Sequence, residues 1–593
     1  MNGSLVATIL FVVSCIVLYA GLLLKKKSNN ELNGVSWLIL SVITVFCYGT
    51  VVAGVINIVR IPVNIWSIGI IYLITGIFLL ISIKKENECQ KYVWERYDFF
   101  CFAVFAIIIF FVAGSYFTPS LKLMYYNSDA AVHFKNAMYV LRNQRIVNMY
   151  FAPLHNALIM ECFMAFVPEV FLFKVYILVD AAMFLLESMF FIVLIRDYLS
   201  TKAMKVIGLI LAILYMFGYP MNSFLFSFFY WSVGVMLIGY VLLMLRYYEN
   251  EAIERRYSVV ALVLALGTIP VTYMLFGPFV FIATFMVLVA ILMRQGKLFT
   301  GNNVLLALKI FLIPTVLAIY YCYVDYLMNM DLSAGEILTI DGGIYREIYI
   351  NFIWVLPFVI YSFVKALKDR RADENIIFTL FFVVITIAMF MMVMKGKMSS
   401  YYFFKFYFPI WMLFFVLSVQ AVSDLWMKSK EIIVSCGIVF LLTFSIVAFK
   451  VESNAINSGT GLSTYEKTGL MFDLYRNNVA LWKARTLQYP DQYFDICNYV
   501  IEEIESDKEV PLLATIENYN SCYWYEGITG NDSSEFYGWH YSLEEVQEKL
   551  ANGDVDYFVV YKNSPIYIQN AGYFMGFEWV YDNELGFVAK IAK

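Results

Sequence analysis

The chain has 593 residues, of which 61% are hydrophobic and 15% are charged, and its mean hydropathy is +0.71. A soluble core cannot absorb that much apolar surface, so the composition excludes a soluble globular protein and is typical of a membrane protein with many spans. The net charge of −4 conceals an asymmetry, because residues 451–593 carry 22 acidic and 9 basic side chains, which leaves +9 for residues 1–450. This distribution argues against nucleic-acid binding and for a soluble outer domain.

Apolar runs that are long enough to cross about 30 Å of hydrocarbon recur from residue 5 to about residue 449. The first run has no preceding basic segment and no small-residue cleavage site, so we expect a retained span and not a signal peptide. We expect about fourteen transmembrane helices, near residues 4–25, 35–58, 65–83, 98–117, 171–195, 204–220, 225–246, 257–275, 276–294, 303–325, 351–367, 376–395, 405–425 and 431–449.

The short basic loops indicate the orientation, because Lys and Arg are retained on the cytoplasmic side. The loops that begin at Lys25, Lys84, Arg196, Arg246, Arg294, Lys365 and Lys428 can all be inside at once. This assignment places both termini outside the cytoplasmic (plasma) membrane. The apolar stretch 151–167 cannot then be a full crossing, since every later basic loop would be exported. We expect a re-entrant or surface-lying helix there.

A polar segment, residues 125–136, follows the fourth predicted span. On a helix that starts near Ser128, the side chains of Asp129, His133 and Asn136 lie on one face. A carboxylate beside an imidazole suits proton abstraction from a hydroxyl, or the binding of a phosphate or a divalent ion. The alternative is that Asp129 only caps the helix, which Asn, Ser and Asp do well. The spacing alone leaves both interpretations open.

A second polar cluster, residues 395–407, lies on the outer side, where basic residues are normally avoided. It contains Lys395, Lys397 and Lys405, and a lipid phosphate or pyrophosphate is the expected counter-charge. Lys405 is the sharpest candidate because it follows Tyr401 and Tyr402 close to the start of a span. The alternative for a single lysine is that it only reaches up to the membrane interface.

Other polar residues have weaker signals. Asp331, Glu336 and Asp341 belong to an outward loop, where acids are usually solvated but can also bind an acceptor or a cation. His155 has no visible partner in the sequence; local packing is the simpler interpretation, and lining the same cavity as Asp129 is the alternative. Nothing in the sequence fixes a metal, although a divalent cation such as Mg²⁺ or Mn²⁺ is compatible with these acids. There is no nucleotide-binding loop, which argues against an ATP-driven pump.

Residues 451–593 predict a small extracytoplasmic α/β domain. Apolar strands are expected at 511–516 and 555–561, and a helix at 542–550 that opens with a Ser542–Glu545 capping box. Cys497 and Cys522 are the two cysteines of this domain, and the sequence leaves open whether they form a disulfide.

The layout resembles bacterial members of the GT-C superfamily, which are integral-membrane glycosyltransferases. Four features carry the resemblance: the outward Asp129-x-x-x-His133 loop, the Pro153-Leu154-His155 helix, the Ser400–Lys405 stretch and the terminal domain with Val555–Lys562. The resemblance begins near residue 98. It implies a GT-C-like catalytic membrane domain at 98–450, preceded by a three-helix membrane module at 1–97 and followed by the outer domain at 451–593.

The resemblance implies a polyprenyl-phosphate-sugar donor and transfer to a glycan, cell-wall polymer or lipid acceptor in envelope polysaccharide biosynthesis. Asp129 would be the base or the acceptor-orienting carboxylate, and His133 would assist at the phosphate or at a bound cation. Lys405, with Lys397 and Lys395, would neutralise the departing lipid phosphate. The family often has two adjacent acids in the first loop, whereas Asp129 has no acidic neighbour. A partner would either come from the loop that carries Asp331, Glu336 and Asp341 or not exist.

Three alternatives remain open. A transporter or flippase of lipid-linked saccharides suits the many spans, although the one-sided outer domain and the lack of a detectable repeat argue against it. A polymerase or ligase that uses a lipid-pyrophosphate donor is the second alternative. A non-catalytic scaffold for envelope assembly is the third.

Overall fold

A computed structural model describes most of the chain. The described stretches are residues 2–86, 88–123, 129–147, 154–296, 300–329, 351–431, 489–505, 507–515, 519–533, 542–552 and 555–591, with shorter pieces at 336, 338–339, 433–434, 436–438, 440, 474–475, 478–479, 482 and 537–538. Two predicted site residues, Asp331 and Asp341, lie outside these ranges.

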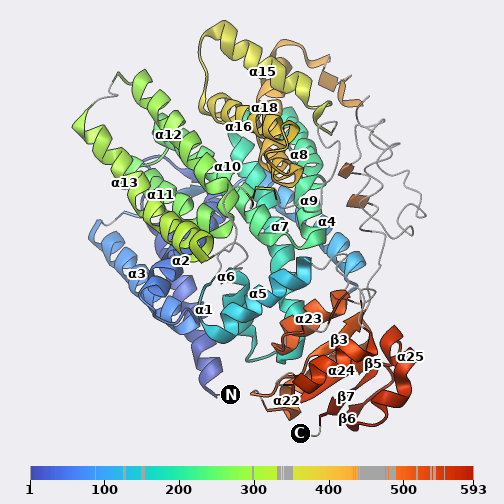
Figure 1. Cartoon of the computed structure of the whole chain (residues 1–593). Coiled ribbons are helices and arrows are strands. Elements are labelled where there is room, and N and C mark those ends of the chain that lie inside the picture. The colour runs from blue at the N-terminus through green and yellow to red at the C-terminus, as the bar shows by residue number, and fades with distance from the viewer. Residues whose placement is uncertain are drawn as a thin grey trace.

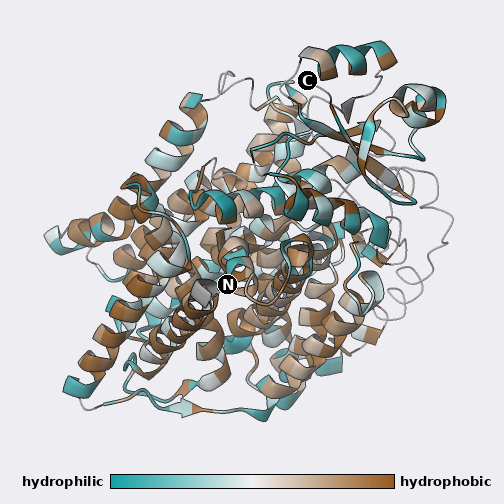
Figure 2. Ribbon diagram, turned by 90° about the horizontal axis from the view of Figure 1, so that it is seen from below, coloured by the Kyte–Doolittle hydropathy of each residue, from teal (hydrophilic) through white to brown (hydrophobic). Residues whose placement is uncertain are grey.

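The membrane part is a bundle of long apolar helices (Figure 1). Twelve segments of the described chain are long and apolar enough to cross a bilayer. Figure 2 shows that these helices are mostly hydrophobic, whereas the C-terminal domain mixes hydrophilic and hydrophobic residues. The helices are α1 (Asn2–Leu24), α2 (Gly34–Ile58), α3 (Ile65–Glu86), α4 (Arg96–Tyr116), α7 (Leu172–Ile195), α8 (Lys202–Met216), α9 (Tyr219–Phe226), α10 (Phe229–Asn250), α11 (Arg255–Thr272), α12 (Gly277–Arg294), α13 (Gly301–Ala318), α16 (Glu374–Met394), α17 (Ser400–Lys405) and α18 (Tyr407–Lys428). The expected multi-pass helical architecture is therefore confirmed.

Two of the fourteen expected spans are not among the twelve. The first corresponds to α15 (Leu356–Asp369), which has 14 residues and a length of about 21 Å, short of the hydrocarbon thickness. The second, 431–449, falls largely outside the described residues. Helices α8 and α9 together form one candidate span, as do α17 and α18.

Helix α10 lies at the centre of the bundle, and its whole span is buried. It packs against α7, α11, α12, α16 and α18. Small residues permit these close contacts, because a Cβ atom at Gly239 would lie 2.9 Å from the side chains of Met412 and Phe190.

The basic loops that the sequence assigns to one side gather at one end of this bundle. They are linked to one another and to neighbouring acids by the following contacts: Lys26 with Glu88, Arg196 with Asp98, Lys27 O with Glu254 N, Arg294 with Glu249 and Glu374, and Asn375 with Tyr198. Lysines and arginines of separate loops therefore lie together at one end of the bundle, and the orientation of that end in the membrane stays a prediction.

Two short helices lie at the opposite end. Helix α5 (Asp129–Asn143) begins at Asp129, and α6 (Leu154–Phe163) packs against it. Helix α6 has ten residues, about 15 Å, which is too short for a crossing. The stretch 151–167 is therefore not a span, as its sequence context predicts.

The C-terminal domain is built on one mixed sheet with the strand order β4-β3-β5-β7-β6. Strand β3 is parallel to β4 and β5, and β7 is antiparallel to both of its neighbours. The elements are α22 (Asp491–Glu503), β3 (Leu512–Thr515), α23 (Tyr519–Thr529), β4 (Tyr537–Gly538), α24 (Leu543–Asn552), β5 (Tyr557–Tyr561), α25 (Pro565–Phe574), β6 (Glu578–Asp582) and β7 (Gly586–Lys590). The predicted small α/β domain is confirmed.

The structure also shows the outcome for two local features of this domain, the capping box and the cysteine pair. Ser542 and Glu545 exchange the two hydrogen bonds of a capping box, of 2.8 and 3.2 Å, at the start of α24. Cys497 and Cys522 are both free and buried in the domain core, so they do not form the disulfide that the sequence left open.

Candidate active site

Lys405 is the most enclosed charged residue of the candidate site. It ends the short helix α17, and only 2% of its surface is exposed. Its Nζ atom lies 3.8 Å from the ring centroid of Tyr401 and 5.3 Å from that of Tyr273. The rings of Tyr402 and Trp231 follow at 5.8 and 5.9 Å. Four aromatic faces therefore hold one ammonium group by cation–π attraction.

The carboxylate of Asp129 lies within electrostatic reach of this ammonium. Burial raises the pKa of Asp129 above its ordinary value, and the positive charge of Lys405 partly offsets that rise. The side chain still has accessible surface, but protein atoms crowd around it and displace much of its hydration. Asp129 is therefore more basic than a solvated carboxylate.

His133 lies one turn further along α5 and points into the bundle. Its Nδ1 atom lies 2.9 Å from the backbone oxygen of Ser227, and its ring makes an edge contact with Tyr230 at 4.5 Å between centroids. Burial, helped by the positive charge of Lys405, lowers the pKa of His133 to about 3. The imidazole is therefore neutral at physiological pH, and its Nδ1–H donates to Ser227, which leaves Nε2 as an acceptor.

Ser227 and Asp180 form a polar layer behind His133. Ser227 links α9 to α10 and has a left-handed backbone with φ of 57°, which turns its carbonyl toward His133. Its hydroxyl donates to Asp180 Oδ2 at 2.6 Å and lies 2.9 Å from the Tyr176 hydroxyl. A buried acid in a membrane span thus fixes the turn that orients the imidazole.

This arrangement combines a base, a fixed neutral imidazole and a buried cation at one end of the bundle. Helix α10 begins beside the site and ends near the basic loops, and α18 does the same from Tyr407 to Lys428. The site therefore lies at the end of the membrane domain opposite the basic loops. Such a group can take a proton from a hydroxyl and can stabilise negative charge on a phosphate.

The structure gathers some of the predicted residues and separates others. Asp129, His133, Lys405, Tyr401 and Tyr402 come together. Lys395 and Lys397 lie exposed in the turn between α16 and α17, and Asn136 is half-buried on α5. Glu336 is exposed, two residues before Leu338, whose oxygen accepts from Ser399 N at 2.8 Å beside α17. The roles of these four residues stay predictions.

His155 belongs to a different environment. Its Nε2 atom lies 2.8 Å from Thr50 Oγ1, its ring stacks on Phe46 with 3.7 Å between centroids, and burial lowers its pKa to about 3. It lines an apolar cavity whose described lining includes neither Asp129 nor Lys405. The simpler interpretation, local packing, therefore describes this histidine better than membership of the Asp129 site.

Sequence reasoning missed the residues that complete the site, namely Ser227, Asp180, Tyr230, Trp231 and Tyr273. One signal was available for Asp180, because an acid inside a predicted span is expensive and is usually functional. The same signal applies to Glu187, whose carboxylate accepts from Ser232 and from Tyr215. The aromatic residues had no such signal, since they are indistinguishable in sequence from other residues of an aromatic-rich bundle.

No group of three or more His, Cys, Asp or Glu side chains that could hold a metal ion occurs among the residues that the structure describes. The described part of the site offers two carboxylates, those of Asp129 and Asp180, and the imidazole of His133.

Known structures of similar architecture include two of ArnT from Cupriavidus metallidurans. The form bound to undecaprenyl phosphate matches 83% of this chain and 97% of ArnT, with a TM-score of 0.46 and 12% identity. The apo form matches 82% and 96%, with a TM-score of 0.45 and 14% identity. The archaeal oligosaccharyltransferase AglB from Archaeoglobus fulgidus, in complex with an inhibitory peptide and a dolichol-phosphate, matches 96% of this chain and 70% of its own, with a TM-score of 0.28 and 11% identity.

No protein-family model and no curated protein matches the sequence. Structural similarity at these low TM-scores and sequence identities does not identify the reaction of this protein. The reaction has to follow from the residues of the site.

Proposed function

We propose that this protein is a membrane glycosyltransferase that moves a sugar from a polyprenyl-phosphate donor to a hydroxyl of a glycan, cell-wall polymer or lipid acceptor. One observation carries the proposal: Asp129, from the first polar loop, meets Lys405, from the last part of the membrane bundle. Sugar transfer from a phosphate leaving group needs a base that takes the proton of the acceptor hydroxyl. It also needs a positive charge that stabilises the departing phosphate.

In this mechanism, Asp129 accepts the proton of the acceptor hydroxyl as its oxygen attacks the anomeric carbon of the donor. The bond between that carbon and the phosphate oxygen breaks, and the polyprenyl phosphate leaves with the electron pair. The raised pKa of Asp129 favours this proton transfer. The positive charge of Lys405, which lies among four aromatic rings, stabilises the negative charge that develops on the phosphate.

His133 would act as a fixed neutral group in this scheme. Its Nδ1–H donates to the backbone oxygen of Ser227, which fixes the tautomer and the orientation of the ring beside the reacting groups. Bringing both substrates to one geometry supplies a further part of the rate enhancement.

The site would face the exterior of the plasma membrane. This orientation rests on the basic loops, which gather at the other end of the bundle and which the positive-inside rule assigns to the cytoplasm. The C-terminal domain contacts α5 at the same end as Asp129 and would lie outside as well.

The test is a transfer assay with protein purified in detergent, a radiolabelled polyprenyl-phosphate sugar and candidate acceptors. Asp129→Asn keeps the size of the side chain and removes its basicity, so transfer should fall by about 10²–10⁴-fold. Asp491→Asn, the same chemical change at an exposed position in α22, should leave turnover unchanged. Wild-type turnover in Asp129→Asn would reject the assignment of the base.

The same assay separates an enzyme from a flippase. Formation of a glycosidic bond needs no sealed compartment, whereas lipid flipping does. If wild-type protein forms no bond with any donor in detergent but moves lipid-linked saccharide across sealed vesicles, the proposed reaction is wrong.

A further inference from the structure

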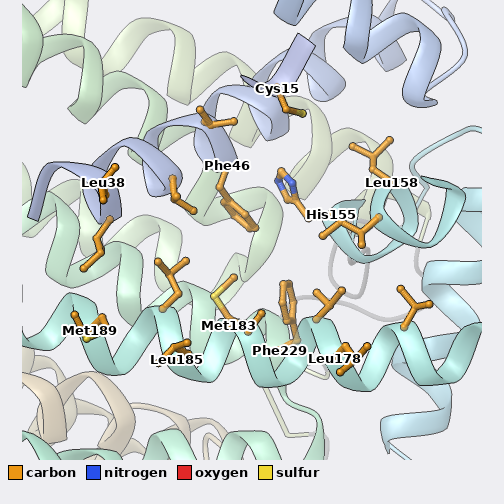
Figure 3. Close-up of a pocket in the computed structure, with 18 of the residues that line it drawn as sticks. Cys15, Leu38, Phe46, His155, Leu158, Leu178, Met183, Leu185, Met189 and Phe229 are labelled. Atoms are coloured by element: carbon orange, nitrogen blue, oxygen red, sulfur yellow. The ribbon is translucent and has the colours of Figure 1, made fainter. Parts of the chain in front are cut away.

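A second, apolar site lies between the N-terminal helices and α7. Its cavity has a volume of about 640 Å³. Figure 3 shows Leu38 and Phe46 of α2 on one side of this space, facing Leu178, Leu185 and Met189 of α7 on the other. Helix α6 contributes His155 and Leu158 near one end.

The lining is almost free of polar groups that could bind a ligand. The imidazole of His155 is already hydrogen-bonded to Thr50, and the hydroxyl of Tyr72 donates to the backbone oxygen of Val45 at 3.4 Å. Lys and Arg are absent from the described lining residues. A charged or strongly polar occupant would therefore lose its hydration without compensation, so the occupant must be a hydrocarbon.

The cavity is open sideways, toward the region that the bilayer fills. Three of its lining residues, Val42, Phe102 and Leu178, are 41%, 49% and 51% exposed on the surfaces of α2, α4 and α7. Along α7 the lining runs from Val175 to Met189, a length of about 21 Å at the rise of an α-helix. Half of a bilayer's hydrocarbon core is about 15 Å thick, so one chain from one leaflet fits in this length.

We propose that this cavity binds one acyl chain of a bilayer phospholipid, whose head group stays at the membrane interface. The described lining of the cavity includes neither Lys405 nor any of the four rings around its ammonium, and Phe229 and Trp231 lie on different faces of α10. An anionic isoprenoid carrier needs a cation for its phosphate, and the cavity lining supplies none among its described residues. The proposal does not depend on the glycosyl-transfer reaction.

The bound chain has a structural consequence for the site described above. It fills the space beside His155 and Leu158 of α6, and α6 packs against α5, which carries Asp129. Without the chain, the side chains along this face would lack packing partners. The lipid chain therefore packs against α6 and stabilises its position.

The first test fills the cavity with protein. Ala182 lines it and is exposed in the structure, so Ala182→Trp can occupy the space without displacing the core. Val384→Trp is the matched control, since Val384 is 53% exposed on α16 and does not line the cavity. By native mass spectrometry, wild type and Val384→Trp should each retain one phospholipid, and Ala182→Trp should lose it at least about 5-fold. Equal retention in all three proteins would overturn the proposal.

The second test uses the wild-type protein and therefore does not depend on folding of a variant. Phosphatidylcholine with a photoreactive acyl chain, at low mole fraction in nanodiscs, should label peptides of α2 and α7 saturably, and label α16 only in proportion to lipid concentration. Uniform labelling of all lipid-facing helices would contradict a specific site. Recovery of an isoprenoid in place of a phospholipid would contradict the assigned occupant.

Discussion

The ammonium of Lys135 on α5 lies 2.7 Å from the carboxylate of Glu526 on α23, which ties the helix of the candidate base to the C-terminal domain. The contact is extended by Arg142, whose guanidinium donates to the backbone oxygens of Gly527 and Ile528 at 3.2 and 2.5 Å. These oxygens belong to the C-terminal turn of α23, where a cation is favourable. The C-terminal domain thus fixes the helix that begins at Asp129.

Removal of the Glu526 carboxylate should loosen this contact. Its side chain is 1% exposed, and Oε1 also accepts from the backbone N–H of Ser533 at 3.0 Å. Glu526→Ala leaves that buried donor unpaired, so we expect a loss of about 2 kcal/mol in the stability of the domain. Thermal unfolding in detergent measures the loss, and the exposed Glu548→Ala on α24 is the control. Equal unfolding temperatures for the two variants would show that the contact contributes little.

Gly527 is required for the close approach of the same two helices. A Cβ atom there would lie 2.8 Å from Cδ1 of Phe134 and 3.4 Å from the Lys135 backbone. Gly527→Ala should therefore cost about 1–3 kcal/mol through displacement of Phe134. Gly572→Ala is a matched control, because nothing lies within 4 Å of the added atom and alanine is the better helix former. A variant at Gly527 that unfolds at the temperature of the Gly572 variant would refute the packing argument.

The sequence predicted the elements whose signals are local. Spans follow from runs of apolar residues, and α5 and its polar face follow from the spacing of Asp129 and His133. The placement of Asp129 and Lys405 at one site came only from the family resemblance, since no local pattern brings α5 to α17. The turn at Ser227 was unpredictable for the same reason: its left-handed backbone matters because it faces His133 from another helix.

The pH dependence of transfer should follow the protonation of Asp129. The base must be ionised, so activity is lost as the pH falls through its raised pKa. Lys405→Gln removes a charge that lowers this pKa, so the acid limb of kcat/KM should move to higher pH. The same variant should also lower kcat/KM for the donor about 10–100-fold, the amount expected for a lost charge-assisted contact. Lys395→Gln, at an exposed position in the turn before α17, should leave the acid limb of kcat/KM at its wild-type pH. An identical shift of this limb in both variants would argue against an interaction of Asp129 with Lys405.

His133 should make folding depend on pH through its burial. Its pKa is about 3 in the folded state, against 6.5 for an ordinary histidine, so the unfolded chain binds the proton more tightly. The stability from the neutral imidazole is complete above pH 6.5 and decreases as the pH falls toward 3. Between pH 6.5 and 5 the loss is about 2 kcal/mol for this one group, at about 1.4 kcal/mol per pH unit.

His155 has the same lowered pKa of about 3, so the two histidines should contribute equally to the decrease in folding stability at low pH. His133→Gln and His155→Gln should each remove one histidine's contribution to the pH dependence of folding stability, and the double variant should remove both. The measurement is the unfolding temperature of the four proteins in detergent at pH 7.5, 6.5 and 5. If His133→Gln keeps the pH slope of the wild type, its imidazole is not neutral and buried, and its assignment as a fixed neutral group at the site would be wrong.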